Sequence, residues 1–227
     1  VVIIGESTTR NNMEIYAYYR NTNPQLNKIK NELYLFKNII SPHTHTILSL
    51  NKVLSLADYY RPENNKLGTI IQLANQADFE TYWLSNQKPI GAYESLVSQY
   101  AKASKHTFYV SNFNADHQKF DEVLLPKLKE TINEKASKKI IFLHLEGSHI
   151  NYNEKYPEDF NFFTDEPKTQ FKTDEAYQII NEYDNSVRYN DYVVSEIIDM
   201  VKKANKNSYV VYFSDHGEEV FKDYEYF

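Results

Sequence analysis

The most informative stretch of this chain reads Tyr-Val-Val-Tyr-Phe-Ser-Asp-His-Gly-Glu at residues 209–218. Its apolar first half predicts a buried strand, which stops abruptly at Asp215 and His216. Gly217 then lets the backbone turn sharply or approach a ligand closely. A carboxylate and an imidazole brought to one point suit Zn²⁺ or Mn²⁺ better than a soft metal. By itself this pattern is also typical of a capped turn, so it needs support from the rest of the chain.

Two further apolar runs end in the same manner. Val-Val-Ile-Ile at residues 1–4 is followed by Gly5 and Glu6, and Lys-Ile-Ile-Phe-Leu at 139–143 continues into His-Leu-Glu-Gly-Ser-His at 144–149. Near-continuous apolar runs are typical of interior strands in a parallel sheet. In open α/β sheets, ligands bind outside the carboxyl ends of the strands. We therefore predict three interior, mainly parallel strands that end at the same edge: residues 1–5, 139–145 and 208–213.

A fourth element supplies a hydroxyl group. Ser-Pro-His-Thr-His-Thr at residues 41–46 precedes an apolar pattern with helical spacing. Thr46 therefore falls at the start of a helix, where a hydroxyl residue often caps. Free N–H groups at such a helix start also attract anions such as phosphate. Thr46 could be a cap and nothing more, but the ligand-rich strand ends favour a nucleophile beside a metal.

The composition limits the class of protein. With 227 residues and 41% hydrophobic content, the chain is long enough for one globular domain with a substantial core. Its net charge of −6 argues against a general nucleic-acid-binding protein, which would present a basic face. The absence of cysteine excludes disulfides and thiolate metal sites. Because residue 1 already falls in a predicted strand, and the chain stops shortly after residue 216, we expect a fragment that is truncated at both ends.

Strand-like and helix-like segments alternate along the chain, which predicts an α/β fold with a mostly parallel central sheet. The longest expected helix covers residues 174–203, and residues 150–172 should form a long loop of the kind that often has a function. Pro126 should kink or split a helix predicted over residues 116–135. The remaining predictions are helices at 22–32, 46–57 and 92–103, and strands at 34–40, 81–84 and 107–110.

Taken together, these residues make the chain resemble the phosphoethanolamine transferases of the alkaline phosphatase/sulfatase superfamily. These are bacterial inner-membrane enzymes with an N-terminal transmembrane bundle and a periplasmic catalytic domain. The matching motifs run through almost the whole chain, and their order and spacing are specific. They are Val-Ile-Ile-Gly-Glu at 2–6, Tyr-Arg-Asn-Thr-Asn-Pro at 19–24, Ser-Pro-His-Thr-His-Thr at 41–46, Trp-Leu-Ser-Asn-Gln at 83–87, His-Leu-Glu-Gly-Ser-His at 144–149, Tyr-Asp-Asn-Ser at 183–186 and Ser-Asp-His-Gly-Glu-Glu at 214–219.

The resemblance implies an alkaline-phosphatase/sulfatase-like three-layer sandwich. Residues 1–227 would be a fragment of one catalytic domain, without the membrane domain and without the end of the catalytic domain. The family binds a catalytic Zn²⁺ through four residues, which correspond here to Glu6, Thr46, Asp215 and His216. Thr46 would be the nucleophile. His149 would face the same pocket, either joining a second zinc or contacting the phosphate, so the number of ions is left open.

The implied reaction has two steps. Thr46 attacks phosphatidylethanolamine and keeps phosphoethanolamine as a covalent intermediate, which a lipid A, lipopolysaccharide core or other envelope acceptor then takes. We expect His149 to move protons, with His43 and His45 as alternatives for that role.

Further residues and the setting of the enzyme are also implied. Asn86 and Gln87 should hydrogen-bond substrate, although a strand-end turn explains them equally well. Lipid-A-directed members, including the mobile colistin-resistance enzymes, carry disulfides, whereas this chain resembles a cysteine-poor branch whose acceptor need not be lipid A. We expect a monomer at the bacterial inner membrane, with the catalytic domain in the periplasm.

Three alternatives remain at this point. The chain could be another member of the superfamily, namely a sulfatase, a phosphodiesterase or a glycerol-phosphate transferase. Sulfatases normally use a modified cysteine, which this chain lacks. It could also be a non-catalytic binding domain that kept the fold, although the intact Glu6, Thr46, Asp215 and His216 argue against decay. Finally, all the motifs could be structural.

Overall fold

The sheet is parallel in every strand pairing that the structure describes. The structure is a computed structural model that describes residues 1–89, 96–110, 120–204 and 206–224. Within these residues, five strands pair in the order β3-β2-β4-β1-β5, and every pairing is parallel. The strands are β1 (Val2–Gly5), β2 (Glu80–Ser85), β3 (His106–Tyr109), β4 (Lys139–His144) and β5 (Val211–Ser214).

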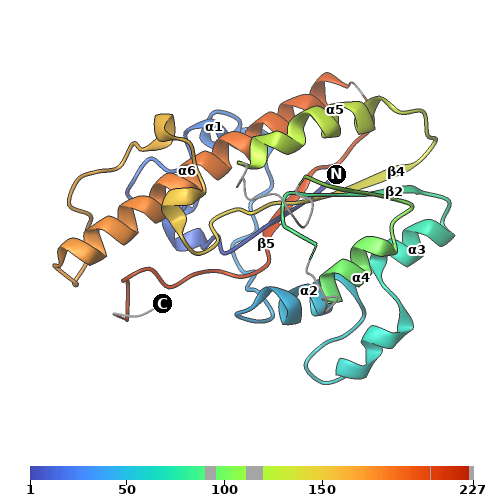
Figure 1. Ribbon diagram of the computed structural model, residues 1–227, viewed down its shortest axis with the longest axis horizontal. Coiled ribbons are helices and arrows are strands. Elements are labelled where there is room, and N and C mark those ends of the chain that lie inside the picture. The colour runs from blue at the N-terminus through green and yellow to red at the C-terminus, as the bar shows by residue number, and fades with distance from the viewer. Residues whose placement is uncertain (90–95, 111–119, 205, 225–227) are drawn as a thin grey trace.

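Helices cover both faces of this sheet. Figure 1 shows α1, α5 and α6 on one face and α2, α3 and α4 on the other, which confirms the predicted three-layer sandwich. The helices are α1 (Pro24–Lys28), α2 (Thr46–Leu54), α3 (Ile70–Gln76), α4 (Leu96–Lys102), α5 (Leu125–Asn133) and α6 (Asp174–Lys203). None of the helices in the described residues is both long enough and apolar enough to span a bilayer.

The core divides into two clusters, one on each side of the sheet. Successive side chains of a strand point to opposite faces, so Ile3 packs with the α5 and α6 side whereas Ile4 packs with Leu50 and Leu54 of α2. The same alternation separates Leu143 from Phe142 on β4. The apolar runs of the central strands are therefore continuous because both of their faces are buried.

The strand register brings three strand ends to one edge. Ile4 of β1 lies opposite His144 of β4, and Gly5 lies opposite Ser214 of β5. The backbone N–H of Asp215 donates to the carbonyl oxygen of Gly5 at 3.0 Å. The residues that follow these three strands consequently emerge side by side, as the sequence predicted.

One part of the strand prediction is wrong. The apolar pattern of residues 208–213 predicts an interior strand, but β5 is the outermost strand, with β1 as its partner among the described residues. Val211 is half exposed and Tyr209 is almost fully exposed. The apolar run arises because Tyr212 and Phe213 pack onto opposite core clusters, and an edge strand can do this as well as an interior one.

A second strand prediction also fails. Residues 34–40 form no strand, and Tyr34, Phe36 and Ile40 are exposed. The segment is held by the guanidinium of Arg10, which donates to the carbonyl oxygens of Lys37 and Ile39. β-propensity cannot make a strand where no partner strand is available.

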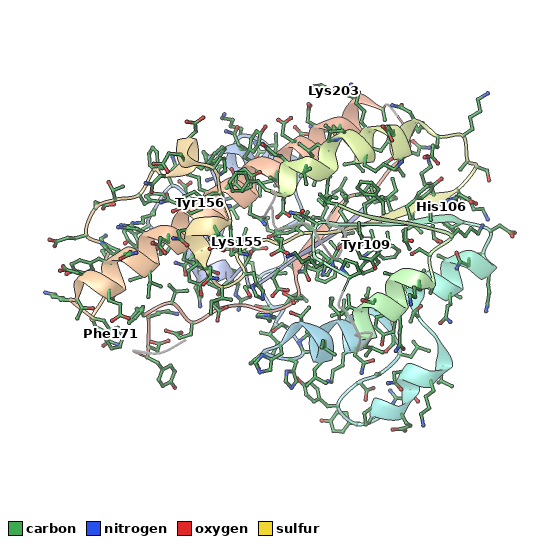
Figure 2. All side chains as sticks on the ribbon, viewed as in Figure 1. His106, Tyr109, Lys155, Tyr156, Phe171 and Lys203 are labelled. Carbon is green, nitrogen blue, oxygen red and sulfur yellow. The ribbon has the colours of Figure 1, made fainter. Side chains whose placement is uncertain are left out.

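The helix predictions hold in most places. The predicted span 174–203 matches α6, and the 22–32 segment forms α1 followed by a 3₁₀ turn at Lys30–Glu32. Pro126 falls in the first turn of α5, after a separate 3₁₀ turn at Asp121–Leu124, so the expected split is present. The starts of the two helices predicted at 92–103 and 116–135 lie outside the described residues. His106 begins β3 at the outer margin of the sheet, and Figure 2 labels it. Its Nε2 atom lies 3.0 Å from a carboxylate oxygen of Glu80.

Candidate metal centre

Three potential metal ligands meet at the carboxyl edge of the sheet. Glu6 follows β1 directly, and Asp215 and His216 follow β5. Their ligand atoms all lie within 4.8 Å of one another. His216 Nε2 is 2.8 Å from Glu6 Oε1 and 3.6 Å from Asp215 Oδ2. Because Gly5 and Ser214 are opposite one another in the sheet, the register of these two strands sets the spacing of the group.

Thr46 completes the group from the other side. Its hydroxyl donates to Glu6 Oε2 at 2.9 Å. Thr46 is the first residue of α2, and the cap position belongs to His45, whose side chain forms no capping bond. The hydroxyl of Ser49, one turn later, donates to the carbonyl oxygen of Asp215 and ties this helix to the end of β5. Thr46 is thus not used as a cap, and its hydroxyl faces the carboxylates.

The turn after Glu6 is held in an uncommon conformation. Ser7 has a φ of 55°, in the left-handed region that non-glycine residues rarely adopt. Its hydroxyl donates to Glu6 Oε1 at 3.0 Å, and its backbone N–H donates to Asp215 Oδ1 at 3.2 Å. The hydroxyl of Tyr183 on α6 donates to the carbonyl oxygen of Ser7 at 2.7 Å. Strained residues of this kind persist where the surrounding structure fixes them, and they cluster at functional sites.

Asp121 anchors the loop that supports Glu6 from behind. Asp121 is buried and accepts hydrogen bonds from the backbone N–H groups of Glu146 and Gly147, both at 2.9 Å. The next residue, Ser148, donates its N–H to the carbonyl oxygen of Glu6 at 2.9 Å. Gly147 lies so close that a Cβ atom there would be 2.6 Å from the same oxygen. No pattern in the sequence marked Asp121, because its role depends on contacts with distant residues.

The charges of the group are strongly coupled. Burial raises the pKa of Glu6, but the hydrogen bond and charge of His216 outweigh it, and the pKa falls to about 2. Burial likewise opposes the imidazolium form of His216, yet its hydrogen bond to Glu6 and the charge of Asp215 raise its pKa to about 9. Burial and the charge of Glu6 raise the pKa of Asp215 to about 7. A proton on His216 therefore offsets the charge of the Glu6 carboxylate in the metal-free chain.

The donor set fits a zinc ion. Two carboxylates, one imidazole and one hydroxyl supply the oxygen and nitrogen ligands that Zn²⁺ accepts, usually four in number. Within the described part of the chain, Asp215 Oδ2 is buried and receives no hydrogen bond. A buried carboxylate oxygen without a partner is costly, and a cation at this point would satisfy it.

The other predicted site residues differ in whether they contact this group. His149 is exposed on the loop after β4, close enough for its charge to lower the pKa of Glu6. His43 and His45 precede α2, with ring centroids 5.8 Å apart. Gln87 donates to Glu6 Oε2 at 3.3 Å and to the carbonyl oxygen of Leu145 at 2.9 Å, so it reaches the carboxylate. Asn86 instead donates to Asp121 Oδ1 at 2.9 Å and supports the loop.

Comparison with known proteins assigns the family. The model of the sulfatase family matches residues 1–227. The chain belongs to the sulfatase family. The phosphoethanolamine transferase EptC of Escherichia coli is 34% identical over 229 residues, which cover 97% of this chain and 40% of that protein. EptA of Helicobacter pylori is 32% identical, over 97% of this chain and 42% of that protein. This member of the sulfatase family thus spans less than half the length of these curated relatives.

Solved structures agree with the fold. A crystal structure of the C-terminal periplasmic domain of E. coli EptC, in complex with Zn, has a TM-score of 0.91 and 33% identity, covering 96% of this chain and 63% of that one. The integral membrane lipooligosaccharide phosphoethanolamine transferase EptA of Neisseria meningitidis has a TM-score of 0.81 and 26% identity, covering 96% of this chain and 41% of that one. The EptC domain was thus solved with zinc, and the donor set of this chain fits the same ion.

Proposed function

We propose that this chain transfers phosphoethanolamine from phosphatidylethanolamine to a cell-envelope acceptor such as lipopolysaccharide. Zinc would be held by Glu6, Thr46, Asp215 and His216, and Thr46 would be the nucleophile. The observation that carries this proposal is the Thr46 hydroxyl, which points at a carboxylate–imidazole cluster from the start of a helix. The relatives, which are phosphoethanolamine transferases, support the transferred group, and the zinc-bound EptC domain supports the metal.

The side chains account for each step of the transfer. A bound Zn²⁺ would lower the pKa of a ligated hydroxyl and polarise the phosphoryl group. Thr46 Oγ1 would form a bond to phosphorus as the bond to the diacylglycerol oxygen breaks. The hydroxyl proton, which points at Glu6 Oε2 in the metal-free chain, would be released to solvent. N–H groups at the start of α2 would stabilise the charge that develops on the phosphoryl oxygens.

The transfer also needs a residue that donates a proton to the departing oxygen and accepts one from the acceptor group. We assign this role to His149, which would protonate the departing diacylglycerol oxygen and then accept a proton from the acceptor group. His149 is exposed, and it is close enough for its charge to lower the pKa of Glu6. His43 and His45 lie on the segment before α2 and are alternatives. Gln87, through its bond to Glu6, would orient the carboxylate or the bound headgroup.

The setting follows from the donor. Phosphatidylethanolamine is a membrane lipid, and the relatives include the periplasmic domain of EptC and the integral membrane protein EptA. We accordingly place the activity in the periplasm at the inner membrane, with residues 1–227 as part of one catalytic domain. The acceptor would be a hydroxyl or phosphate group of the envelope.

Intact-mass measurement tests the proposal directly. After incubation with zinc and phosphatidylethanolamine vesicles, the parent chain should carry one phosphoethanolamine group, located on Thr46 by peptide mapping. Thr46→Ala should remove the adduct, and Thr46→Ser should retain part of it because a hydroxyl remains. If Thr46→Ala still transferred the group at the parent rate, a covalent threonine intermediate would be excluded.

A further inference from the structure

The helices next to the nucleophile carry an unusually apolar outer surface. Residues 46–76, called the lobe below, comprise α2, a 3₁₀ helix at Pro62–Leu67 and α3. Figure 1 shows the connection between α2 and α3 projecting away from the sheet. Nineteen large hydrophobic side chains are exposed among the described residues, and nine of them fall within the lobe. Soluble surfaces rarely gather apolar side chains in this way without a binding partner.

Both helices of the lobe are apolar on two sides. On α2, Leu50 and Leu54 are buried against the sheet, whereas Ile47 and Leu48 face outward and are 45% and 44% exposed. On α3, Ile71 is fully buried while its neighbour Ile70 is 43% exposed. A helix with one apolar face is stabilised by packing that face on the core, whereas a helix that is apolar on two sides needs a second packing partner. The sheet supplies only the first.

The exposed apolar side chains lie on helices that are themselves well packed. Ser55 and Thr69 form an antiparallel β-bridge that joins the end of α2 to the start of α3. Thr69 also begins α3 with a complete capping box. The hydroxyl of Tyr100 on α4 donates to Asn51 Oδ1 at 2.6 Å and fixes the middle of α2. The apolar side chains are therefore held in place on a rigid support.

The charge of the lobe differs from that of the chain. The whole chain carries −6, but the lobe has three cations, Lys52, Arg61 and Lys66, and two carboxylates. The ammonium group of Lys52 lies 5.0 Å from the ring centre of Tyr59, and the adjacent Tyr60 is 93% exposed. Surfaces that bind the interface of an anionic bilayer typically carry apolar side chains, tyrosines and cations together.

We infer that the outer surface of the lobe rests on an anionic phospholipid bilayer. This inference builds on the proposed function, because the phosphodiester of a phospholipid donor lies at the bilayer surface. Thr46 is the first residue of the lobe, and the exposed side chains of Ile47 and Leu48 follow it immediately. Their insertion would bring the nucleophile to the level of the headgroups, since interfacial helices lie about 5–10 Å into the boundary between headgroups and acyl chains.

Vesicle binding tests this surface with a matched pair of variants. Tyr59 and Tyr60 are 67% and 93% exposed on the lobe, and Tyr224 and Tyr209 are 70% and 88% exposed elsewhere. The parent chain should co-sediment with vesicles of phosphatidylethanolamine and phosphatidylglycerol, and binding should weaken as salt rises. Tyr59→Ser/Tyr60→Ser should bind about tenfold more weakly, whereas Tyr209→Ser/Tyr224→Ser should bind as the parent does.

A second measurement identifies the surface without relying on stability. Because the chain has no cysteine, Tyr60→Cys and Tyr209→Cys each give one site for an environment-sensitive fluorophore. The probe at position 60 should shift to the blue when vesicles are added, and the probe at 209 should not. Three results would each overturn the inference. They are equal fluorescence shifts at both positions, no vesicle binding by the parent, and equal vesicle binding by the two double tyrosine variants.

Sedimentation velocity and transfer rates distinguish a bilayer-binding lobe from a dimer interface. If Tyr59→Ser/Tyr60→Ser instead converted a dimer to a monomer and left vesicle binding intact, a second copy of the chain would cover the lobe and the inference would be wrong. Transfer from a short-chain, monomeric phosphatidylethanolamine should be unchanged in this variant, while transfer from vesicles should fall with binding. Vesicle binding without any transfer would refute the proposed function and leave the surface standing.

Discussion

Gly147 offers the most direct test of how the candidate metal centre is supported. This residue has a φ of +54°, and a Cβ atom added to it would lie 2.6 Å from the carbonyl oxygen and 2.7 Å from the backbone nitrogen of Glu6. Both neighbours are backbone atoms of a proposed metal ligand, so they cannot move aside as a flexible side chain would. Gly147→Ala should therefore displace Glu6 itself.

The size of the displacement follows from these contacts. Real Cβ atoms essentially never approach other atoms closer than 3.0 Å, so the 2.6 Å contact must open by at least 0.4 Å. Metal–ligand distances tolerate only about 0.2 Å of change. We expect Gly147→Ala to bind zinc about 10–100-fold more weakly, the range typical of losing support around a metal ligand. The left-handed backbone should cost a further 1–2 kcal/mol or so of stability.

Zinc affinity should be measured by competition with a chromophoric chelator, and the metal-free melting temperature by circular dichroism. Gly68→Ala is the matched control, because Gly68 also has a positive φ, of +116°, but its added Cβ meets only Gln72 Oε1 at 3.2 Å. It should lower the melting temperature and leave zinc affinity unchanged. Parental zinc affinity in Gly147→Ala, or an equal loss in Gly68→Ala, would refute the proposed support of Glu6.

Three further predictions concern the same edge of the sheet. Glu6→Gln should weaken zinc binding, so added zinc should partly restore its activity. Added zinc should not restore the activity of Thr46→Ala, which lacks the proposed nucleophile. Equal rescue of both variants would contradict the separate roles of ligand and nucleophile. Because the pKa of His216 is raised to about 9, its contribution to metal-free stability is present below about pH 6.5 and is lost as the pH rises through 9. Zinc must displace that proton, so affinity measured by chelator competition should rise about tenfold per pH unit from about pH 7 to 9, and a flat profile would contradict the raised pKa. Asp121→Asn places an amide N–H₂ group against backbone N–H donors, so the free energy of unfolding, measured by thermal denaturation, should fall by about 1–3 kcal/mol. Glu130→Gln, on the exposed side of α5, is the control and should leave the stability unchanged.

The fold was predictable where a pattern is local. The α6 span was predictable because its apolar spacing continues over many turns. The structure adds a cap at Thr173, whose hydroxyl accepts from the backbone N–H of Ala176. The meeting of Glu6 with Asp215 followed from the rule that parallel strands end at one edge. The segment 34–40 failed because strand formation depends on a partner that its own residues do not specify.

The hydrogen bonds that hold the candidate metal centre in place were not predictable, because they too depend on partners far away in the sequence. Asp121 and Gln87 act through backbone groups of the loop after β4, and a sequence pattern does not reveal which distant carbonyl or N–H group a side chain will meet. The edge position of β5 was missed because a continuous apolar run indicates that both faces of a strand are buried. The number of neighbouring strands depends instead on the topology of the sheet.

The candidate metal centre also sets an order of events in folding. The hydrogen bond between the Ser7 N–H and Asp215 joins residues 208 positions apart. At synthesis rates of about 5–20 residues per second, roughly 10–40 s separate the appearance of these two residues. β4 is synthesised before β5. From the appearance of β4 until that of β5, β1 can pair with β4 alone, and one edge of β1 is open to pairing with other chains. With the proposed ligand set, zinc capture would have to follow the docking of β5, and zinc binding would then report that β5 has paired with β1.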